Sequence, residues 1–434
     1  MMDCFALTTL ESPNNQVATA IENVRGYGML HERTRKVLAL ALAAVLAFGL
    51  FGTAGCATED TGEGDGDGEA TGETQVIKIG VQTALTGPLP DYGAAAKNGC
   101  ELAVEDFGTF EMDGVTYQVE LVVLDDKAEP AESAVVAQTM VDEGVVGVIG
   151  SLTTGATLSA IPIYAENRIP QISGSVTGPK ANEGAVDTFY RTCWNDAVQG
   201  EALAVWAMEL GAEKVVLMDD NGAYAVGLAD VAEAKLQEAG VETLRQNCQS
   251  GDKDLSAQVA NVKEFAPDAI IFTGYHPEAG LMRKQMIEAG LGDVIFMGGD
   301  GIKSTEFVAE AGGTENAAGC YATFGGFPEA QQPGYTAFAE KYEAAYGEGV
   351  GPYAQNNYDA LGALISAIKQ AGSLDTEEII AALQTLEYEG VTGTFSFATA
   401  SEGAVARGDV VVSGLTPENV PRYVVEGEDW AAVE

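Results

Sequence analysis

The sequence predicts an α/β fold in which parallel sheets are covered by helices on both faces. Short apolar runs, each of roughly four to eight residues, alternate with longer amphipathic segments along the chain from Val76. The chain has 434 residues, of which about 379 remain after an N-terminal leader of 55 residues. That is more than one hydrophobic core usually supports, so we expect two lobes.

The expected strand and helix units follow one another in a regular order. In the first half of the chain the strands cover 76–83, 117–125 and 145–150, and the helices cover 94–107, 130–142 and 154–164. Proline at the start of the second helix is typical of a first helical position. Further along, strands over 214–219, 269–274 and 294–299 repeat the pattern, each followed by a helical segment.

The N-terminal residues have the parts of an export signal. Arg33, Arg35 and Lys36 precede the apolar run 37–51, and small residues then lead to Cys56. The run is short for a spanning helix, which needs roughly 20 apolar residues. We expect cleavage before Cys56 and lipidation of this cysteine, with an uncleaved anchor and plain secretion as the alternatives.

A polar tether follows the leader. Residues 1–55 form the expected leader, with Met29 as the suggested true start. Residues 56–75 are rich in Gly, Thr and acids and contain little to bury, so we expect them to stay solvated. Such a segment would hold a folded domain away from the outer face of the cytoplasmic membrane.

The charge balance excludes several classes of partner. The formal net charge is −43, and the leader contributes equal numbers of acidic and basic residues. Nucleic acid needs Lys and Arg for its phosphates, so we expect no nucleic-acid partner. An anionic membrane surface would repel the domain, so we expect membrane contact only through the lipid anchor.

Motifs for catalysis and for cofactors are missing from the sequence. No Gly-rich fingerprint opens a helix after a strand, and neither a P-loop nor a G-x-S-x-G elbow is present. His276 is the single histidine after the leader, which argues against histidine clusters and most triads. We expect neither enzymatic activity, nor a cofactor, nor a metal, and we interpret His276 as a surface residue.

Five stretches of the sequence carry a resemblance to one known family. They are IGVQTALTGPLPDYGAAAKNGCELAVEDF, LDDKAEPAESAVVAQTMVDEGVVGVIGSLTTGAT, FTGYHPEAGLMRKQMIEAGL, FMGGDGI and GPYAQNNYDALGALISAIKQAGS. Their order and spacing resemble the leucine/isoleucine/valine-binding proteins of ABC transporters, which are type I periplasmic binding proteins. The resemblance covers essentially the whole chain from Val76.

The resemblance implies two Rossmann-like lobes joined by three crossing strands, with a ligand in the cleft between them. The crossings would lie near Arg191–Trp194, Cys320–Thr323 and Asp409–Ser413. The first lobe would then contain 76–191 and 321–408, and the second 192–320 and 409–434.

Cysteine pairing is a separate question. The disulfide of the family is missing, because Ala128 and Thr153 stand in its places. Cys193 and Cys320 fall in adjacent crossing strands, where a hinge disulfide is one hypothesis and two free thiols are the favoured alternative.

One loop suggests an anion site from the residues themselves. The strand over 145–150 runs through SLTTG at 151–155 into a helix, so hydroxyls meet the free amides of a helix N-terminus. Ligands bind beyond the carboxyl ends of strands in open parallel sheets. The resemblance implies that Thr154, Ser175 and Thr177 hold the carboxylate and part of the ammonium of an amino acid. A helix cap at Thr154 and an ordinary turn at Ser175 and Thr177 stay open as alternatives.

The remaining site residues come from the resemblance. Asp300 matches the carboxylate that meets the ligand ammonium, where the family more often has Glu. Tyr224 and Tyr275 match second-lobe positions that line the cleft, and Tyr92 and Tyr353 match first-lobe positions around the ligand side chain. A cap or turn role for Asp300 and ordinary packing for each Tyr are the alternatives.

The predicted function is capture of a small solute outside the cell. We expect a monomeric, lipid-anchored protein that binds a branched-chain or other aliphatic amino acid and delivers it to an ABC permease. An amide, a urea-like solute or an aromatic acid is the alternative ligand, and a ligand-sensing receptor is the alternative role.

Overall fold

The computed structural model describes residues 74–183, 186–400, 407–411 and 416–433. The predicted leader, Cys56 and nearly all of the tether lie outside the described residues, as do residues 412–413 of the third predicted crossing. Within the described ranges, no helix combines the length and apolar character needed to cross a membrane.

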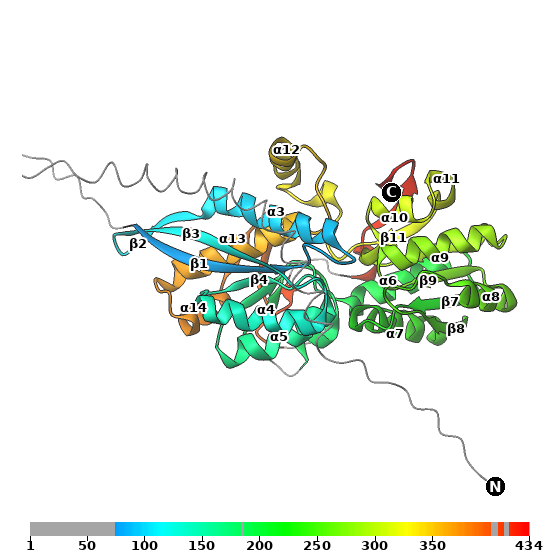
Figure 1. Ribbon diagram of the computed structural model, residues 1–434, viewed down its shortest axis with the longest axis horizontal. Helices are drawn as coiled ribbons and strands as arrows, with labels where there is room; N and C mark the ends of the chain where they lie inside the picture. The colour runs from blue at the N-terminus through cyan, green and yellow to red at the C-terminus, as the bar shows by residue number, and fades with distance from the viewer. Residues whose placement is uncertain (1–73, 184–185, 401–406, 412–415, 434) are drawn as a thin grey trace, which may run out of the picture. The chain divides into compact units, whose positions relative to one another are not determined.

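The first large sheet is built from residues 74–191 (Figure 1). Its order is β2-β3-β1-β4-β5-β6, and all neighbours are parallel except β2 and β3. The strands are β1 Thr74–Thr83, β2 Thr109–Met112, β3 Val115–Asp125, β4 Val148–Gly150, β5 Gln171–Ser173 and β6 Phe189–Arg191.

Helices cover both faces of this sheet. On one face α3 packs against α13, and on the other α4 packs against α5 (Figure 1). The bounds are α3 Pro90–Phe107, α4 Pro130–Glu143, α5 Thr154–Glu166, α12 Tyr335–Tyr346, α13 Ala354–Ala371 and α14 Thr376–Leu383. Gly99 allows the close approach of α3 to α13, since a Cβ there would lie 2.1 Å from the Ala354 carbonyl oxygen.

The second large sheet has the order β16-β15-β11-β10-β9-β7-β8. The strands from β8 to β11 are parallel, and β15 and β16 add an antiparallel edge. They are β7 Lys214–Asp219, β8 Glu242–Asn247, β9 Ala269–Phe272, β10 Ile295–Gly298, β11 Tyr321–Thr323, β15 Arg422–Glu426 and β16 Asp429–Ala432.

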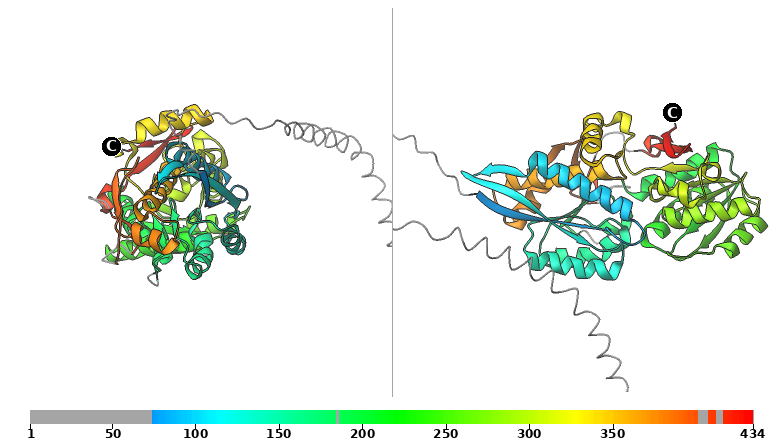
Figure 2. Two further views of the ribbon diagram at one scale, coloured as in Figure 1. Left: turned by 90° about the vertical axis from the view of Figure 1, so that its left-hand side faces the viewer. Right: turned by 45° about the horizontal axis from the view of Figure 1, so that its top comes forward.

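Helices also sandwich the second sheet, which Figure 2 shows from other sides together with the first. Apolar residues of α6 and α7 form one core with the sheet, and residues of α8, α9 and α10 form another. The bounds are α6 Asp196–Glu209, α7 Ala223–Glu238, α8 Ser256–Phe265, α9 His276–Glu288, α10 Glu306–Glu310 and α11 Thr314–Ala317.

The remaining elements are short. A small antiparallel sheet contains β12 Glu387–Glu389, β13 Thr394–Phe397 and β14 Val410–Val411. The 3-10 turns are η1 Pro179–Asn182, η2 Asp300–Ile302, η3 Glu329–Gln331 and η4 Pro417–Asn419.

The predicted fold class is confirmed, while several boundaries differ. α3 begins at Pro90 rather than at Ala94, because proline is well suited to the first turn, where its missing N–H removes no intrahelical bond. The strand predicted over 145–150 is paired only from Val148 to Gly150.

Hydrogen bonding also refines the proposed division into lobes. The resemblance predicts that Tyr321–Thr323 belong to the first lobe, yet β11 is bonded to β10 and β15 of the second sheet. It predicts that Val410–Val411 belong to the second lobe, yet β14 pairs with β13. We therefore propose that the second boundary falls after Thr323 and the third after Val411.

The crossing segments lie side by side where they are described. The Trp194 amide donates to the Gly325 carbonyl at 3.0 Å, and the Arg191 amide donates to the Gly408 carbonyl at 2.9 Å. The buried Arg191 Nε lies 2.7 Å from Asp409 Oδ1, so an ion pair joins the first crossing to the third.

All four cysteines of the described ranges are buried free thiols: Cys100, Cys193, Cys248 and Cys320. The hinge disulfide is therefore not formed, and the alternative of two free thiols holds.

Candidate functional site

One pocket brings the eight predicted ligand-binding residues together. It lies beyond the carboxyl ends of the strands of both large sheets. Its lining consists of Leu89, Tyr92, Leu152, Thr154, Ser175, Thr177, Tyr224, Tyr275, Asp300 and Tyr353. Leu89 and Leu152 were not predicted, because a single Leu in a loop gives no signal that separates a pocket wall from packing.

The hydroxyl side of the pocket is formed at the start of α5. Thr153, not Thr154, is the helix cap, and its Oγ1 accepts a hydrogen bond from the Ala156 amide at 3.4 Å. The Thr154 Oγ1 accepts from the Gly178 amide at 3.2 Å, which leaves the hydroxyl proton able to donate into the pocket. The cap alternative for Thr154 is thus wrong.

The two other hydroxyls are oriented by bonds that they donate. Ser175 Oγ donates to the Leu152 carbonyl at 2.8 Å, and Thr177 Oγ1 donates to Asp196 Oδ2 at 3.1 Å. Each oxygen keeps lone pairs that can accept from a ligand ammonium. Together with the positive end of the α5 dipole, this side suits a carboxylate and a neighbouring amine.

Asp300 carries the acidic side of the pocket and is only 4% exposed. Its Oδ1 accepts from Gln199 Nε2 at 2.5 Å and from the Tyr224 hydroxyl at 3.0 Å. Burial raises the pKa of Asp300 despite these hydrogen bonds. A positively charged partner would therefore stabilise the ionised carboxylate.

A second carboxylate, which sequence reasoning missed, lies next to Asp300. Asp196 is the first residue of α6 and is fully buried. Gln199 Nε2 also donates to Asp196 Oδ1, at 3.2 Å, so one amide bonds both acids. Burial, and then the charge of Asp300, raise the pKa of Asp196. Spacing of three residues on a helix could have linked Asp196 with Gln199, but not with Asp300.

The aromatic residues close the pocket from both sheets. The Tyr92 hydroxyl donates to the Asp300 carbonyl at 2.7 Å, and the Tyr224 and Tyr275 ring centroids lie 5.2 Å apart. Tyr353 stacks on Phe324 with centroids 4.3 Å apart. Each of these tyrosines therefore packs against protein neighbours and also forms part of the pocket wall.

Tyr353 has two unusual features. Its φ of +62° lies in the left-handed region, which is uncommon for a residue with a side chain. Within the described ranges its buried hydroxyl makes no hydrogen bond of normal geometry, although it lies close enough to Asp300 to lower the pKa of that carboxyl. Both features are typical of a residue that the surrounding fold holds ready for a ligand.

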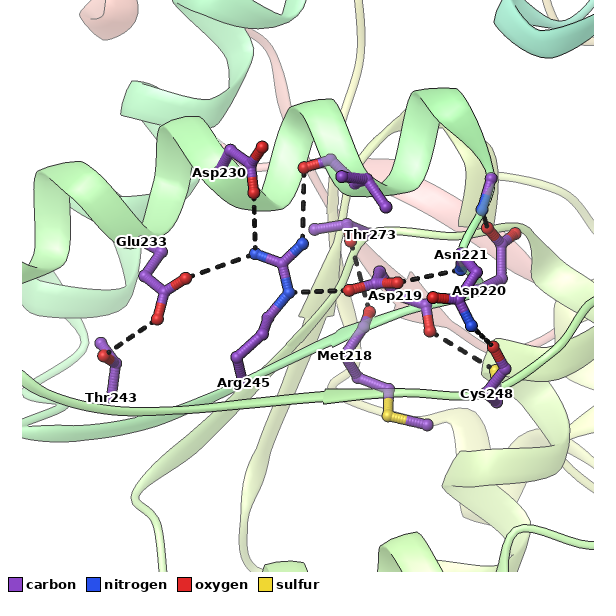
Figure 3. Close-up of polar contacts among 12 residues, drawn as sticks. Met218, Asp219, Asp220, Asn221, Asp230, Glu233, Thr243, Arg245, Cys248 and Thr273 are labelled. Carbon is purple, nitrogen blue, oxygen red and sulfur yellow. Dashed lines mark hydrogen bonds and ion pairs between the residues drawn. The ribbon is translucent and has the colours of Figure 1, made fainter.

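A polar cluster fixes the loop that presents Tyr224. Figure 3 shows Arg245 reaching between Asp219, Asp230 and Glu233, with its Nε 2.7 Å from Asp219 Oδ2. The other Asp219 oxygen accepts from the Asn221 amide at 2.9 Å. These bonds hold the turn between β7 and α7.

His276 lies next to this site and is buried. The interpretation of His276 as a surface residue is therefore wrong. It is 2% exposed, and its ring stacks on Tyr92 with centroids 5.9 Å apart. Nδ1 lies 2.9 Å from Glu310, and Nε2 lies 3.4 Å from Asp91 of α3. The two carboxylates offset the energetic cost of burying this ring. Their contact with the ring cannot be seen in the sequence, where these residues stand far apart.

The pocket is equipped for binding rather than for bond making. Its lining offers hydroxyls, phenols, aliphatic groups and a carboxylate, and it contains neither His nor Cys as a nucleophile or base. In the described part of the chain, no group of three or more His, Cys, Asp or Glu side chains could hold a metal ion.

Known proteins resemble this chain in both sequence and fold. The family described as "Periplasmic binding protein" matches residues 76–412. Leu/Ile/Val-binding protein homolog 1 from Brucella abortus is 33% identical over 364 residues, which cover 82% of this chain and 90% of that protein. A solved leucine binding protein, LivK from Thermotoga maritima, has a TM-score of 0.74 at 30% identity and covers 82% of this chain and 98% of its own.

A second solved structure shares this fold. LivJ from Streptococcus pneumoniae, a branched-chain amino acid transporter substrate binding protein in complex with isoleucine, has a TM-score of 0.69 at 30% identity. The matched region covers 83% of this chain and 100% of that one. The chain therefore belongs to the type I periplasmic binding proteins of the leucine/isoleucine/valine family, which are extracytoplasmic binding proteins of ABC transporters and not enzymes.

Proposed function

We propose that the pocket around Asp300 binds an α-amino acid with a small apolar side chain, such as leucine, isoleucine or valine. The observation that carries this proposal is the placement of opposite polar functions in one small cavity. Thr154 lies at the positive end of α5, and a buried carboxylate faces it from η2. An amino acid zwitterion complements both sides at once.

The charge of Asp300 favours a cationic group in the ligand. A buried carboxylate without a cation is unfavourable, and exclusion of water strengthens its attraction to an ammonium. A ligand that bridges the two lobes would therefore favour the closed state over the open one. An amide or an aromatic acid would leave Asp300 without a cation, which makes the alternative ligands less suitable.

The lining of the cavity favours an apolar side chain. Leu89 and Leu152 join four tyrosine rings in the pocket wall. Ligand pockets are lined mainly by apolar and aromatic side chains with a few polar groups that orient the ligand. The isoleucine-bound relative, LivJ, supports the same class of ligand for this chain.

The cellular role that we propose is delivery of the amino acid to an ABC permease. We further propose that the protein acts as a monomer and is lipid-anchored through Cys56, with the acidic segment 56–75 as its tether. Small residues before Cys56 and the apolar run before them support this anchoring. A receptor role would need a signalling partner in place of the permease.

Calorimetry against the twenty amino acids, amides and aromatic acids tests the proposed ligand. A ligand at 100 times its Kd should stabilise the protein by roughly 2.7 kcal/mol, which a thermal shift detects. Asp300→Asn should weaken binding of the best amino acid by at least about thirtyfold, because loss of one partner of a buried charge pair costs about 2 kcal/mol or more.

Asp300→Glu is the matched control, since it keeps the charge and should retain measurable binding. Unchanged affinity in Asp300→Asn would contradict the role of Asp300. Preference for an uncharged or anionic solute would contradict the amino acid assignment.

A further inference from the structure

The pocket acid Asp300 has a second buried acid, Asp196, next to it, which is one acidic group more than a single ligand ammonium requires. Asp196 and Asp300 are both at least 96% buried and are bonded by the same Gln199 amide. Gln199 Oε1 has no hydrogen-bond partner within the described ranges, although it is buried. The arrangement therefore contains two buried acids and one buried acceptor, Gln199 Oε1, that has no donor among the described residues.

The surroundings support one negative charge on this pair but not two. The N-terminus of α6 and the nearby Arg191 favour an ionised Asp196. The Arg191 guanidinium, however, is already bonded to Asp409 and to the carbonyls of Val176 and Gly178. A second charge in the same buried space would lack a cation.

The other titratable groups that face the pair remain neutral. Burial raises the pKa of each pocket phenol well above its usual value, and burial also raises the pKa of the Cys193 thiol. The phenols are Tyr92, Tyr224, Tyr275 and Tyr353. Burial likewise raises the pKa of both acids of the pair, and the charge of Asp300 raises the pKa of Asp196 further.

We propose that Asp196 and Asp300 hold one shared proton in the empty cleft and release it to solvent when a ligand ammonium binds. In this exchange the ammonium replaces the proton, so the net charge of the buried pair with its cation stays the same. The inference rests on the proposed function, since it requires a ligand with an ammonium.

Asp196 is a positioning residue in this scheme. It lies outside the pocket lining and acts through Thr177, whose hydroxyl it orients, and through Gln199. A neutral or anionic solute cannot replace the proton. The pair therefore selects amino acids over the corresponding oxo acids and carboxylic acids.

Titration calorimetry of the intact domain with L-leucine counts the protons directly. The measurement is made in buffers of different ionisation enthalpy between about pH 5 and 8. Near pH 5 the wild type should release close to one proton per leucine bound. Its affinity should then rise by up to about tenfold per pH unit and level off at higher pH. The oxo acid of leucine should bind at least about tenfold more weakly and release no proton.

Two variants separate the pair from other buried groups. Asp196→Asn removes the like charge, so Asp300 stays ionised and proton release should fall to nearly zero while leucine still binds. Asp359→Asn is the control, because Asp359 is another buried acid, with a pKa raised by burial to about 6, and it bonds Val391 and Thr392 away from the pocket. This control should leave the proton count unchanged.

Each outcome decides the proposal. Leucine binding by the wild type without proton release would overturn it and leave the proposed function standing. The same proton count in Asp196→Asn as in the wild type would also overturn it, and absence of binding by any amino acid would overturn both. If Asp196→Asn fails to fold, the pH profile of the wild type still decides. If His276 instead took up a proton when the cleft closes, the proton count measured per leucine would have the opposite sign, so the two events can be told apart.

Discussion

At the scale of single residues, His276 has a stabilising role that depends on its charge. Burial alone would lower the pKa of His276, but the bonds to Asp91 and Glu310 outweigh burial and raise the pKa to about 9. Asp91 belongs to α3 and also accepts from the Ser304 hydroxyl at 2.6 Å. The imidazolium therefore joins a helix of the first sheet to α9 and α10 of the second.

This pKa predicts a loss of stability at alkaline pH. The pKa of His276 is higher in the folded chain than its usual value of about 6.5, so its contribution is fully present below pH 6.5 and is lost as pH rises through about 9. Urea unfolding at pH 6, 8 and 10 should show this loss, up to about 3 kcal/mol. His276→Gln should lose less between the same pH values, and an equal loss in both proteins would contradict the prediction.

At the scale of elements, the pocket depends on helices that pack very closely. α3 carries Tyr92 and α13 follows Tyr353, so their crossing sets the distance between two walls of the pocket. Gly99 is the point of contact, with the Ala354 carbonyl where a side chain would stand. Sequence reasoning predicted both segments as related to the family but could not show that they touch.

Gly99→Ala should therefore destabilise the protein. The added methyl group would meet a backbone oxygen at 2.1 Å, and separation of the helices should cost about 1 to 3 kcal/mol. Gly227→Ala in α7 is the control, because the atom nearest to its Cβ would be 4.0 Å away. That change should be neutral or stabilise by up to about 1 kcal/mol. Chemical denaturation of both variants measures the contrast, and equal effects would contradict it.

At the scale of the whole molecule, the segments between the two large sheets are held by a buried ion pair. Arg191 ends β6 and Asp409 precedes β14, so the pair connects parts of the chain that are more than two hundred residues apart. Asn195 Nδ2 also donates to Asp409 Oδ2 at 2.6 Å. The resemblance predicts that both residues lie in crossing segments, but no sequence pattern indicates that they form an ion pair, because neither residue belongs to a motif.

Breaking this pair should destabilise the fold far more than breaking an exposed one. Arg191→Met leaves a buried carboxylate without its cation and should lower the free energy of unfolding by about 3 to 5 kcal/mol. Lys78→Met is the control, since Lys78 and Glu143 are 2.7 Å apart but 37% and 46% exposed. Its loss should change the free energy of unfolding very little in the same urea titration, because an exposed ion pair is screened by solvent. A similar cost for both would show that the Arg191 pair adds no special stability.

The fold class, the order of the strand and helix units and the family could all be predicted from the amino-acid sequence alone. Local periodicity and turn residues carry that information, because each element is specified mainly by its own residues. The resemblance also identified eight side chains that the structure brings into one pocket. Their individual roles in ligand binding stay a prediction.

Which other groups lie next to that pocket became visible only in the folded structure. The pairing of Asp196 with Asp300, the burial of His276 and the membership of β11 in the second sheet all depend on contacts between distant parts of the chain. A carboxylate or an imidazole looks the same in sequence whether it is solvated or buried. Its charge, and therefore its chemistry, is set by the neighbours that folding supplies.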